Sequence, residues 1–232
     1  MRRLVQLRWF WRYAVAGLAL MAITATMTVS AAGGVAAAPG PTGDATVTFR
    51  KIFKSSYPEF VEIKVAESGD GTFDIRQLSD DPNPLPFRVD ASLVHKIFEL
   101  ARQLHDFDGI SLDMHRRIAN LGQKTFTFQN GTEVHSVSFN YTDDHSAQDL
   151  LDIFEGLSRQ QTDLSDLQRT MRYDRLGVND VLRQIEKDYD RKLLPEPSQL
   201  LVSLDQLAAD THYVDIAREQ ARQLAGRIRS SQ

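Results

Sequence analysis

The stretch EFVEIKVAESGDGTFDIRQL, residues 59–78, contains the pattern that decides the fold. From Val61 to Val65 it alternates branched apolar residues with charged ones, which is the period of a strand buried on one face. A second strand-like run, TFDIRQL, follows the Asp70-Gly71 pair, and Asp-Gly between two such runs is a strong signal for a hairpin turn. The stretch therefore predicts two antiparallel strands joined by a turn within ESGDGTF, residues 67–73, where Asp70-Gly71 is the turn signal.

The residues on both sides of this hairpin extend the pattern. TVTFRKIFKSS, residues 46–56, predicts a further strand before it. DDPNPLP, residues 80–86, is rich in proline and predicts a loop. DASLVHKIFELARQL, residues 90–104, spaces its apolar residues along one face of a helix, which Asp90 or Ser92 can cap.

A second hairpin and a long helical part follow. QKTFTFQNGTEVHSVSFNY, residues 123–141, alternates apolar with small polar residues around Asn130-Gly131, a favoured two-residue turn. From residue 143 onward apolar residues recur at helical spacing, and the first helical stripe is interrupted by Gln160 and Gln161. We therefore predict an α+β fold, with an antiparallel sheet packed by helices, followed by an all-helical C-terminal part.

The predicted organisation has four parts. Residues 1–38 resemble a secretory signal peptide, and a Pro/Gly-rich linker follows at 39–45. The α+β sheet domain is predicted at 46–142 and the helical region at 143–232.

The N-terminal segment predicts export. It has four arginines and no acid in its first twelve residues, then an uncharged stretch, then a run of small residues. Cleavage is expected after Ala31, Ala32 or Ala38, where small side chains occupy the positions that signal peptidase reads. The alternative is an uncleaved anchor in the inner membrane, because the apolar stretch is near the lower length limit for a span. The protein is therefore predicted to be periplasmic or secreted, or else anchored by this segment.

The charge of the chain limits its partners. There are 27 basic and 31 acidic residues, and the four arginines of the head leave with the signal, so the mature part has a net charge of about −8. Binding to phosphates needs a basic face, so we expect no nucleic-acid partner. We expect contact with a membrane only through an uncleaved N-terminal segment.

The sequence offers few groups for catalysis. There is no cysteine, which excludes disulfides, thiolate metal sites and cysteine nucleophiles. Serine-hydrolase, zinc-protease and dinucleotide-binding motifs are absent as well. We therefore predict no cofactor and assign no catalytic, cofactor-binding or metal-binding residue from the sequence.

HDFDGISLDMH, residues 105–115, is the stretch richest in metal-ligand side chains. Its candidate ligands for a divalent metal are Asp106, Asp108, Asp113 and His115. An EF-hand loop has glycine at its sixth position, whereas Gly109 stands fourth here. We therefore interpret the stretch as a loop in which Asp and Gly make a turn and Phe107, Ile110 and Leu112 pack against the sheet.

Three segments carry a family resemblance: RRIANLGQKTFTFQNG at 116–131, FKSSYPEFVEIKV at 53–65 and DGTFDIRQL at 70–78. Together they resemble a group of uncharacterised exported bacterial proteins. The resemblance implies an exported location and an α+β domain followed by helices. It implies no catalytic residue, and by analogy it favours a protein that is not an enzyme.

Our leading hypothesis is an exported bacterial binding or scaffold module that is not catalytic. The sheet would be its rigid body, the helical tail its interaction surface, and another protein of the cell envelope its partner. Candidate contact residues on the tail are Tyr189, Tyr213 and Arg218. This hypothesis expects the histidines and aspartates to be scattered and an apolar patch to lie elsewhere.

The alternative hypothesis is a hydrolase or transferase with a His/Asp site assembled from loops. It would use His115 with Asp113, or His135 with a nearby acid. It expects these groups to converge in one concave cleft with shifted pKa values.

Overall fold

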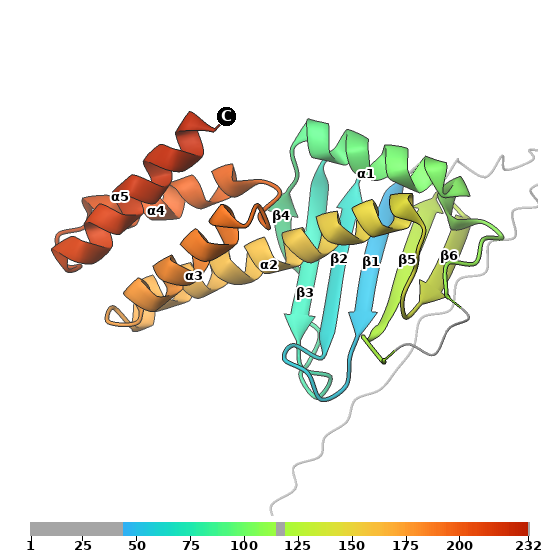
Figure 1. Cartoon of the computed structure of the whole chain (residues 1–232), viewed down its shortest axis with the longest axis horizontal. Helices are drawn as coiled ribbons and strands as arrows, with labels where there is room; N and C mark the ends of the chain where they lie inside the picture. The colour runs from blue at the N-terminus through green and yellow to red at the C-terminus, as the bar shows by residue number, and fades with distance from the viewer. Residues whose placement is uncertain (1–43, 115–118, 232) are drawn as a thin grey trace, which may run out of the picture. The chain divides into compact units, whose positions relative to one another are not determined.

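In the computed structural model, which describes residues 44–114 and 119–231, six antiparallel strands form one sheet and helices follow. Figure 1 shows α1 and α2 across the sheet and α3 to α5 beyond it. The strands are β1 (Thr46–Ile52), β2 (Phe60–Ala66), β3 (Asp70–Arg76), β4 (Leu85–Arg88), β5 (Gln123–Asn130) and β6 (Glu133–Phe139). The helices are α1 (Ala91–Gln103), η1 (His105–Phe107), α2 (His145–Tyr173), α3 (Val178–Asp190), η2 (Pro197–Leu200), α4 (Leu201–Ala209) and α5 (Asp215–Ser230). The predicted fold class is confirmed.

The order of strands in the sheet is β4-β3-β2-β1-β5-β6. The first four strands form a meander, and α1 then carries the chain back so that β5 pairs with the free side of β1. In the central register, Phe49 lies opposite Ile63 on one side and Phe126 on the other. All three side chains are fully buried, which places the centre of the core on β1.

The first hairpin turns at the beginning of the predicted turn segment, residues 67–73. The loop is Glu67-Ser68-Gly69, and Asp70-Gly71 already belongs to β3. Gly69 has a φ of +86°, which a glycine adopts at no steric cost. Gly71 serves packing instead, because a Cβ there would lie 2.5 Å from the ring of Phe87 on β4. The second hairpin is offset by one residue, since Gly131 with a φ of +58° starts its two-residue loop.

Part of the predicted loop at 80–86 is a strand. Leu85 and Pro86 open β4, which pairs with β3 at the edge of the sheet. An edge strand tolerates proline because it needs hydrogen-bond donors on one side only. The proline content therefore indicated an edge position, and the prediction of a loop was wrong for these two residues.

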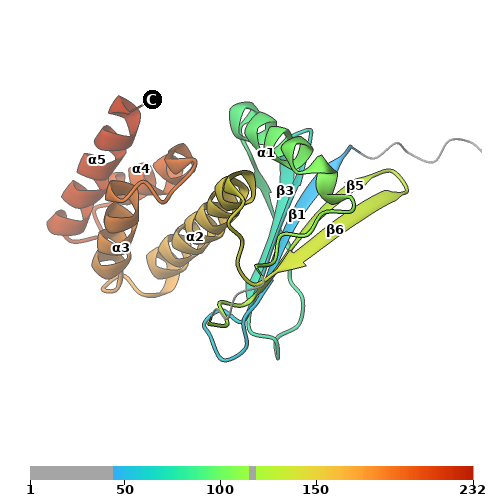
Figure 2. The same cartoon turned by 45° about the vertical axis from the view of Figure 1, so that its right-hand side comes forward.

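Both α1 and α2 lie against the same face of the sheet, as Figure 2 shows. An aromatic cluster fills the space between them and the strands. Phe126 lies 5.8 Å from Phe49, 6.1 Å from Phe154 on α2 and 5.3 Å from Phe139, measured between ring centroids. The opposite face carries mainly polar residues, as expected for an antiparallel sheet with one solvated face.

The long helix α2 contributes to two cores. From Ala147 to Leu157 its buried residues belong to the core of the sheet, and Leu167 belongs to a second core with α3, α4 and α5. Gln160 and Gln161 lie between these parts and are themselves buried. α2 begins after the boundary predicted between residues 142 and 143, yet it packs both against the sheet and against α3 to α5. The predicted boundary therefore stays a prediction.

The predicted signal peptide lies outside the described residues, as does the linker up to residue 43. Among the helices of residues 44–114 and 119–231, none combines the length and the apolar character needed to cross a membrane.

Candidate functional site

The turn predicted after α1 is present, and its residues have a left-handed backbone conformation. His105, Asp106 and Phe107 have φ values of 54°, 50° and 68°, a conformation that costs roughly 1–2 kcal/mol per non-glycine residue. The turn places the ring of Phe107 in the core, 5.5 Å from that of Phe126. Phe107 is 1% exposed, so burial of this ring accounts for the strained turn.

The acids of this loop do not gather around a common point. Asp113 Oδ1 accepts the backbone N–H of Asn140 at 2.9 Å, and Asp108 is exposed. Asp106 Oδ1 is buried without a hydrogen-bond partner, and His115 lies outside the described residues. Within residues 44–114 and 119–231, no three metal-ligating side chains converge. In this part of the chain the loop is held by packing and by Asp113.

The histidines are also dispersed. His135 is half-buried on β6, and its Nε2 lies 3.3 Å from Glu133 on the same strand. His212 Nδ1 lies 2.7 Å from Asp210 in the turn between α4 and α5. Neither histidine lines one of the two clefts described below, whereas His95 on α1 lines the first.

The three candidate contact residues of the helical tail make contacts within the protein. Tyr213 is 7% exposed and donates its hydroxyl to the carbonyl of Met171 at 2.6 Å, so its predicted surface position was wrong. The hydroxyl of Tyr189 donates to the carbonyl of Arg227 at 3.1 Å. Arg218 pairs with the aspartate three residues before it at 3.0 Å.

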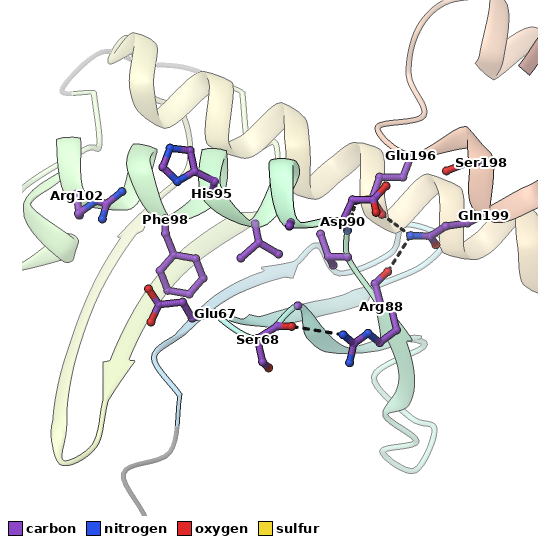
Figure 3. Close-up of a pocket in the computed structure, with 14 residues that line it drawn as sticks. Glu67, Ser68, Arg88, Asp90, His95, Phe98, Arg102, Glu196, Ser198 and Gln199 are labelled. Carbon is purple, nitrogen blue, oxygen red and sulfur yellow. Dashed lines mark hydrogen bonds between the residues drawn. The ribbon is translucent and has the colours of Figure 1, made fainter. Parts of the chain in front are cut away.

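A first cleft, of about 650 Å³, opens between the β2–β3 turn, the start of α1 and η2 (Figure 3). At its floor the Glu196 carboxylate accepts the backbone N–H of Asp90 at 2.6 Å. Gln199 Nε2 donates to the carbonyl of Arg88 at 2.8 Å and also to Glu196. The backbone N–H of Glu196 in turn donates to Gln160 Oε1 at 2.9 Å.

These bonds tie η2 to the start of α1, and we call Gln160, Glu196 and Gln199 the latch. Glu196 takes the role predicted for Asp90 or Ser92, since no side chain of α1 caps its first turn. A carboxylate is stabilised at a helix N-terminus. Burial nevertheless raises the pKa of Glu196, and the N–H of Asp90 opposes this effect. The first cleft is therefore the place where the helical region is fastened to the sheet.

A second cleft, of about 690 Å³, lies between β1, the β1–β2 loop, α2 and α3. Its lining is acidic. The charged residues that line it are Glu59, Glu155, Asp163, Asp166 and Asp188, with Lys51 and Arg159. Five carboxylates against two cations leave the cleft with an excess of negative charge, which favours a cationic ligand.

Three of these carboxylates have clear partners. Glu155 pairs with Lys51 at 2.8 Å, and Asp166 pairs with Arg169 at 2.7 Å. Glu59 accepts backbone N–H groups at 2.7 and 3.3 Å. Glu155 and Asp166 are therefore each paired with a cation, and Glu59 is satisfied by backbone hydrogen bonds.

The remaining two carboxylates differ from each other. Asp188 accepts Gln184 Nε2 at 2.7 Å, and Arg159 lies 3.6 Å from it. Asp163 is 7% exposed, and its Oδ2 is buried without a hydrogen-bond partner among the described residues. Burial, and next the charge of Asp188, raise the pKa of Asp163 to about 7, while Arg159 opposes the shift. Asp163 therefore changes its charge near neutral pH.

The spacing of Asp163 from its apolar and amide neighbours in the sequence indicates that it lies on the buried face of a helix. Asp163 lies three residues after Gln160 and four before Leu167, both fully buried, so it is on the inner face of α2. A charged residue on the buried face of a helix is seldom solvated, and it is therefore a candidate for a function.

Exposed apolar side chains gather at the far end of the helical region. Figures 1 and 2 both show the α2–α3 turn beside the α4–α5 turn, and the bond from Tyr213 to Met171 joins these segments. The apolar tip consists of Tyr173 (76% exposed), Leu176 (86%), Val214 (52%) and Ile216 (76%).

No protein-family model matches the chain, and no curated protein matches it.

Proposed function

We propose that the protein is an exported bacterial binding or scaffold module without catalytic activity, and that it binds another protein of the cell envelope. The apolar tip is the observation that carries this proposal. Its four side chains come from two turns that are adjacent in space, and each is at least half exposed. A group of large apolar side chains in solvent commonly marks an interaction site.

The surroundings of the apolar tip suit a protein partner. Protein interfaces combine an apolar centre with a polar rim. Arg175 and Asp210 provide charges of both signs next to the tip, since both affect the pKa of Tyr213. The mature chain is acidic, which supports a protein partner over a nucleic acid.

The proposed location is the periplasm or the exterior, with the signal peptide removed by cleavage after Ala31, Ala32 or Ala38. The basic head, apolar stretch and small residues of this segment support it. Retention of the segment as a membrane anchor is the alternative.

The hydrolase or transferase alternative needs a histidine and an acid converging in a concave cleft. The His135–Glu133 and His212–Asp210 contacts lie outside the two clefts. His95 lines the first cleft together with acids, but among the described residues no hydrogen bond or ion pair joins it to one of them. Binding is therefore the function that the described geometry supports better.

Native mass spectrometry of the protein, expressed with its own N-terminal segment and gently purified from the cell envelope, tests the proposal. We expect a complex with another protein. The variant Leu176→Ser/Ile216→Ser should lose this partner, because it removes apolar area from the centre of the tip. The control Val202→Ser, at a 66% exposed position on α4, should retain it.

An unmodified chain without any bound protein would contradict the proposal, as would equal partner retention by both variants. Mass lost on addition of a chelator would instead favour a metal site in the loop 105–115.

A further inference from the structure

Asp163 is the carboxylate of the second cleft whose charge is left without a specific partner. Each of the other four lining carboxylates contacts a cation or accepts a hydrogen bond at 3.3 Å or less. A buried carboxylate without a partner is unfavourable when ionised. The second cleft therefore lacks one positive group, and a ligand that enters it can supply that group.

The different burial of the two carboxylate oxygens of Asp163 restricts the chemistry of the positive group that a ligand can supply. Asp163 Oδ2 is fully buried, so only Oδ1 is left to meet a ligand. A guanidinium group binds best through two parallel hydrogen bonds to both oxygens of a carboxylate. An ammonium group is a compact charge that needs a single acceptor at a time, and it suits a carboxylate approached through one oxygen.

The rest of the lining suits an ammonium group on an alkyl chain. Tyr57, Pro58 and Val61 offer apolar surface along the second cleft. Ser158 and Thr162 line the same cleft and offer hydroxyl oxygens as further acceptors for the three N–H bonds of an ammonium group. A lysine side chain has this combination of an apolar stem and a charged end.

We propose that the second cleft binds an alkylammonium group, from a lysine side chain of a partner or from a free diamine, with Asp163 as its counter-ion. This site is distinct from the apolar tip and does not depend on it. The charged groups that face Asp163 are Asp188 on α3, Arg159 and Asp166 on α2, and Arg159 is engaged with Asp188.

Binding is coupled to the protonation of Asp163. The ligand binds the ionised carboxylate, whereas the empty site holds a proton up to about pH 7. Binding should therefore be tighter at pH 8 than at pH 6, and below neutral pH it should release a proton.

Isothermal titration calorimetry of the mature protein tests the proposal with two probes, Nα-acetyl-lysine N-methylamide and 1,5-diaminopentane. We expect binding at pH 8 and at least tenfold weaker binding by Asp163→Asn. Asp205→Asn is the matched control, because it removes the same charge at an exposed residue of α4, outside the second cleft, that already pairs with Arg229. It should bind within about twofold of the unmodified protein.

The absence of binding by the unmodified protein at pH 8 would overturn the proposal. Equal losses in the two variants would do so as well, because they would show a non-specific effect of charge. A second measurement needs no variant: at pH 6.5 the binding enthalpy should depend on the ionisation enthalpy of the buffer. An enthalpy independent of the buffer would exclude Asp163 as the counter-ion.

The two probes distinguish the source of the ammonium group. Tighter binding of the lysine derivative assigns it to a partner's side chain, and tighter binding of the diamine assigns it to a free amine. The tip variant Leu176→Ser/Ile216→Ser should bind both probes normally, so that failure at one site is not mistaken for failure at the other.

Discussion

At the scale of single residues, Asp163 shows how burial changes the behaviour of an ordinary side chain. Its neighbours along the buried face of α2 are an uncharged glutamine and a leucine, Gln160 and Leu167, which do not compensate its charge. The nearest opposing charge, Arg159, is engaged by Asp188. The proton that Asp163 retains near neutral pH is the physical result.

This proton makes the stability of the protein depend on pH. Because the pKa of Asp163 is raised from 3.8 to about 7 on folding, the folded state holds the proton more tightly. Its contribution is present below about pH 4 and is lost as the pH rises through about 7. We expect Asp163→Asn to raise the free energy of unfolding by about 1–3 kcal/mol at pH 8 and to change it little at pH 4.

Urea unfolding of both proteins across this pH range measures the effect. Asp205→Asn, at an exposed carboxylate paired with Arg229, should show no such pH-dependent difference from the unmodified protein. A difference for Asp163→Asn that stays constant with pH would contradict the assignment of the raised pKa.

At the scale of elements, the latch joins segments that are far apart in the chain. Glu196 and Asp90 are 106 residues apart, and Gln199 lies 111 residues from Arg88, whose carbonyl it contacts. Local propensity does not predict such contacts, because each partner is an ordinary polar residue in its own segment. Asp90 is the N-cap residue of α1, as predicted, but its side chain makes no capping hydrogen bond.

Loss of the Glu196 carboxylate should weaken this junction. Glu196→Ala removes the charged acceptor of the part-buried N–H of Asp90, and loss of a hydrogen bond to a charged group costs about 1.5–3 kcal/mol. Glu196→Gln keeps an acceptor oxygen and removes a charge whose ionised form burial disfavours, so it should cost less.

Urea unfolding and amide hydrogen exchange at the start of α1 measure these effects. Glu219→Ala, which breaks an exposed pair with Arg222, should cost less than about 1 kcal/mol. Equal stabilities of Glu196→Ala and Glu219→Ala would show that the latch contributes nothing specific.

At the scale of the whole molecule, α2 joins the two cores of residues 44–114 and 119–231. Its first half packs on the sheet through Phe154, and Leu167 packs with α3 to α5. The apolar tip is at the end of this second core, and the second cleft lies beside α2, which connects the two cores. A partner on the tip and a cation in the cleft would therefore occupy different parts of the surface.

Export predicts a simple spectroscopic property of the mature protein. Both tryptophans of the chain, Trp9 and Trp11, lie within the predicted signal peptide. Cleavage after Ala31, Ala32 or Ala38 should therefore remove all tryptophan fluorescence. An intact mass of the exported product identifies the cleavage position, and tryptophan emission from purified protein would indicate an uncleaved anchor.

Elements with a local pattern could be predicted from the sequence. Alternation around Ile63 and Phe126 predicted strands, and a single apolar face predicted α1, because one buried side imposes a period on a segment. The turn segment 67–73 contains the turn at Gly69, but the Asp70-Gly71 pair within it belongs to β3, since both glycines of the first hairpin fit a turn locally.

Only the tertiary structure decided which groups meet. It made β4 an edge strand, buried Tyr213 under the end of α2, and left Asp163 without a partner beside α3. These outcomes depend on distances between segments that are remote in the chain, and a local pattern contains no information about such distances. Burial and pairing set the charge of Asp163, so its role followed from packing and not from its residue type.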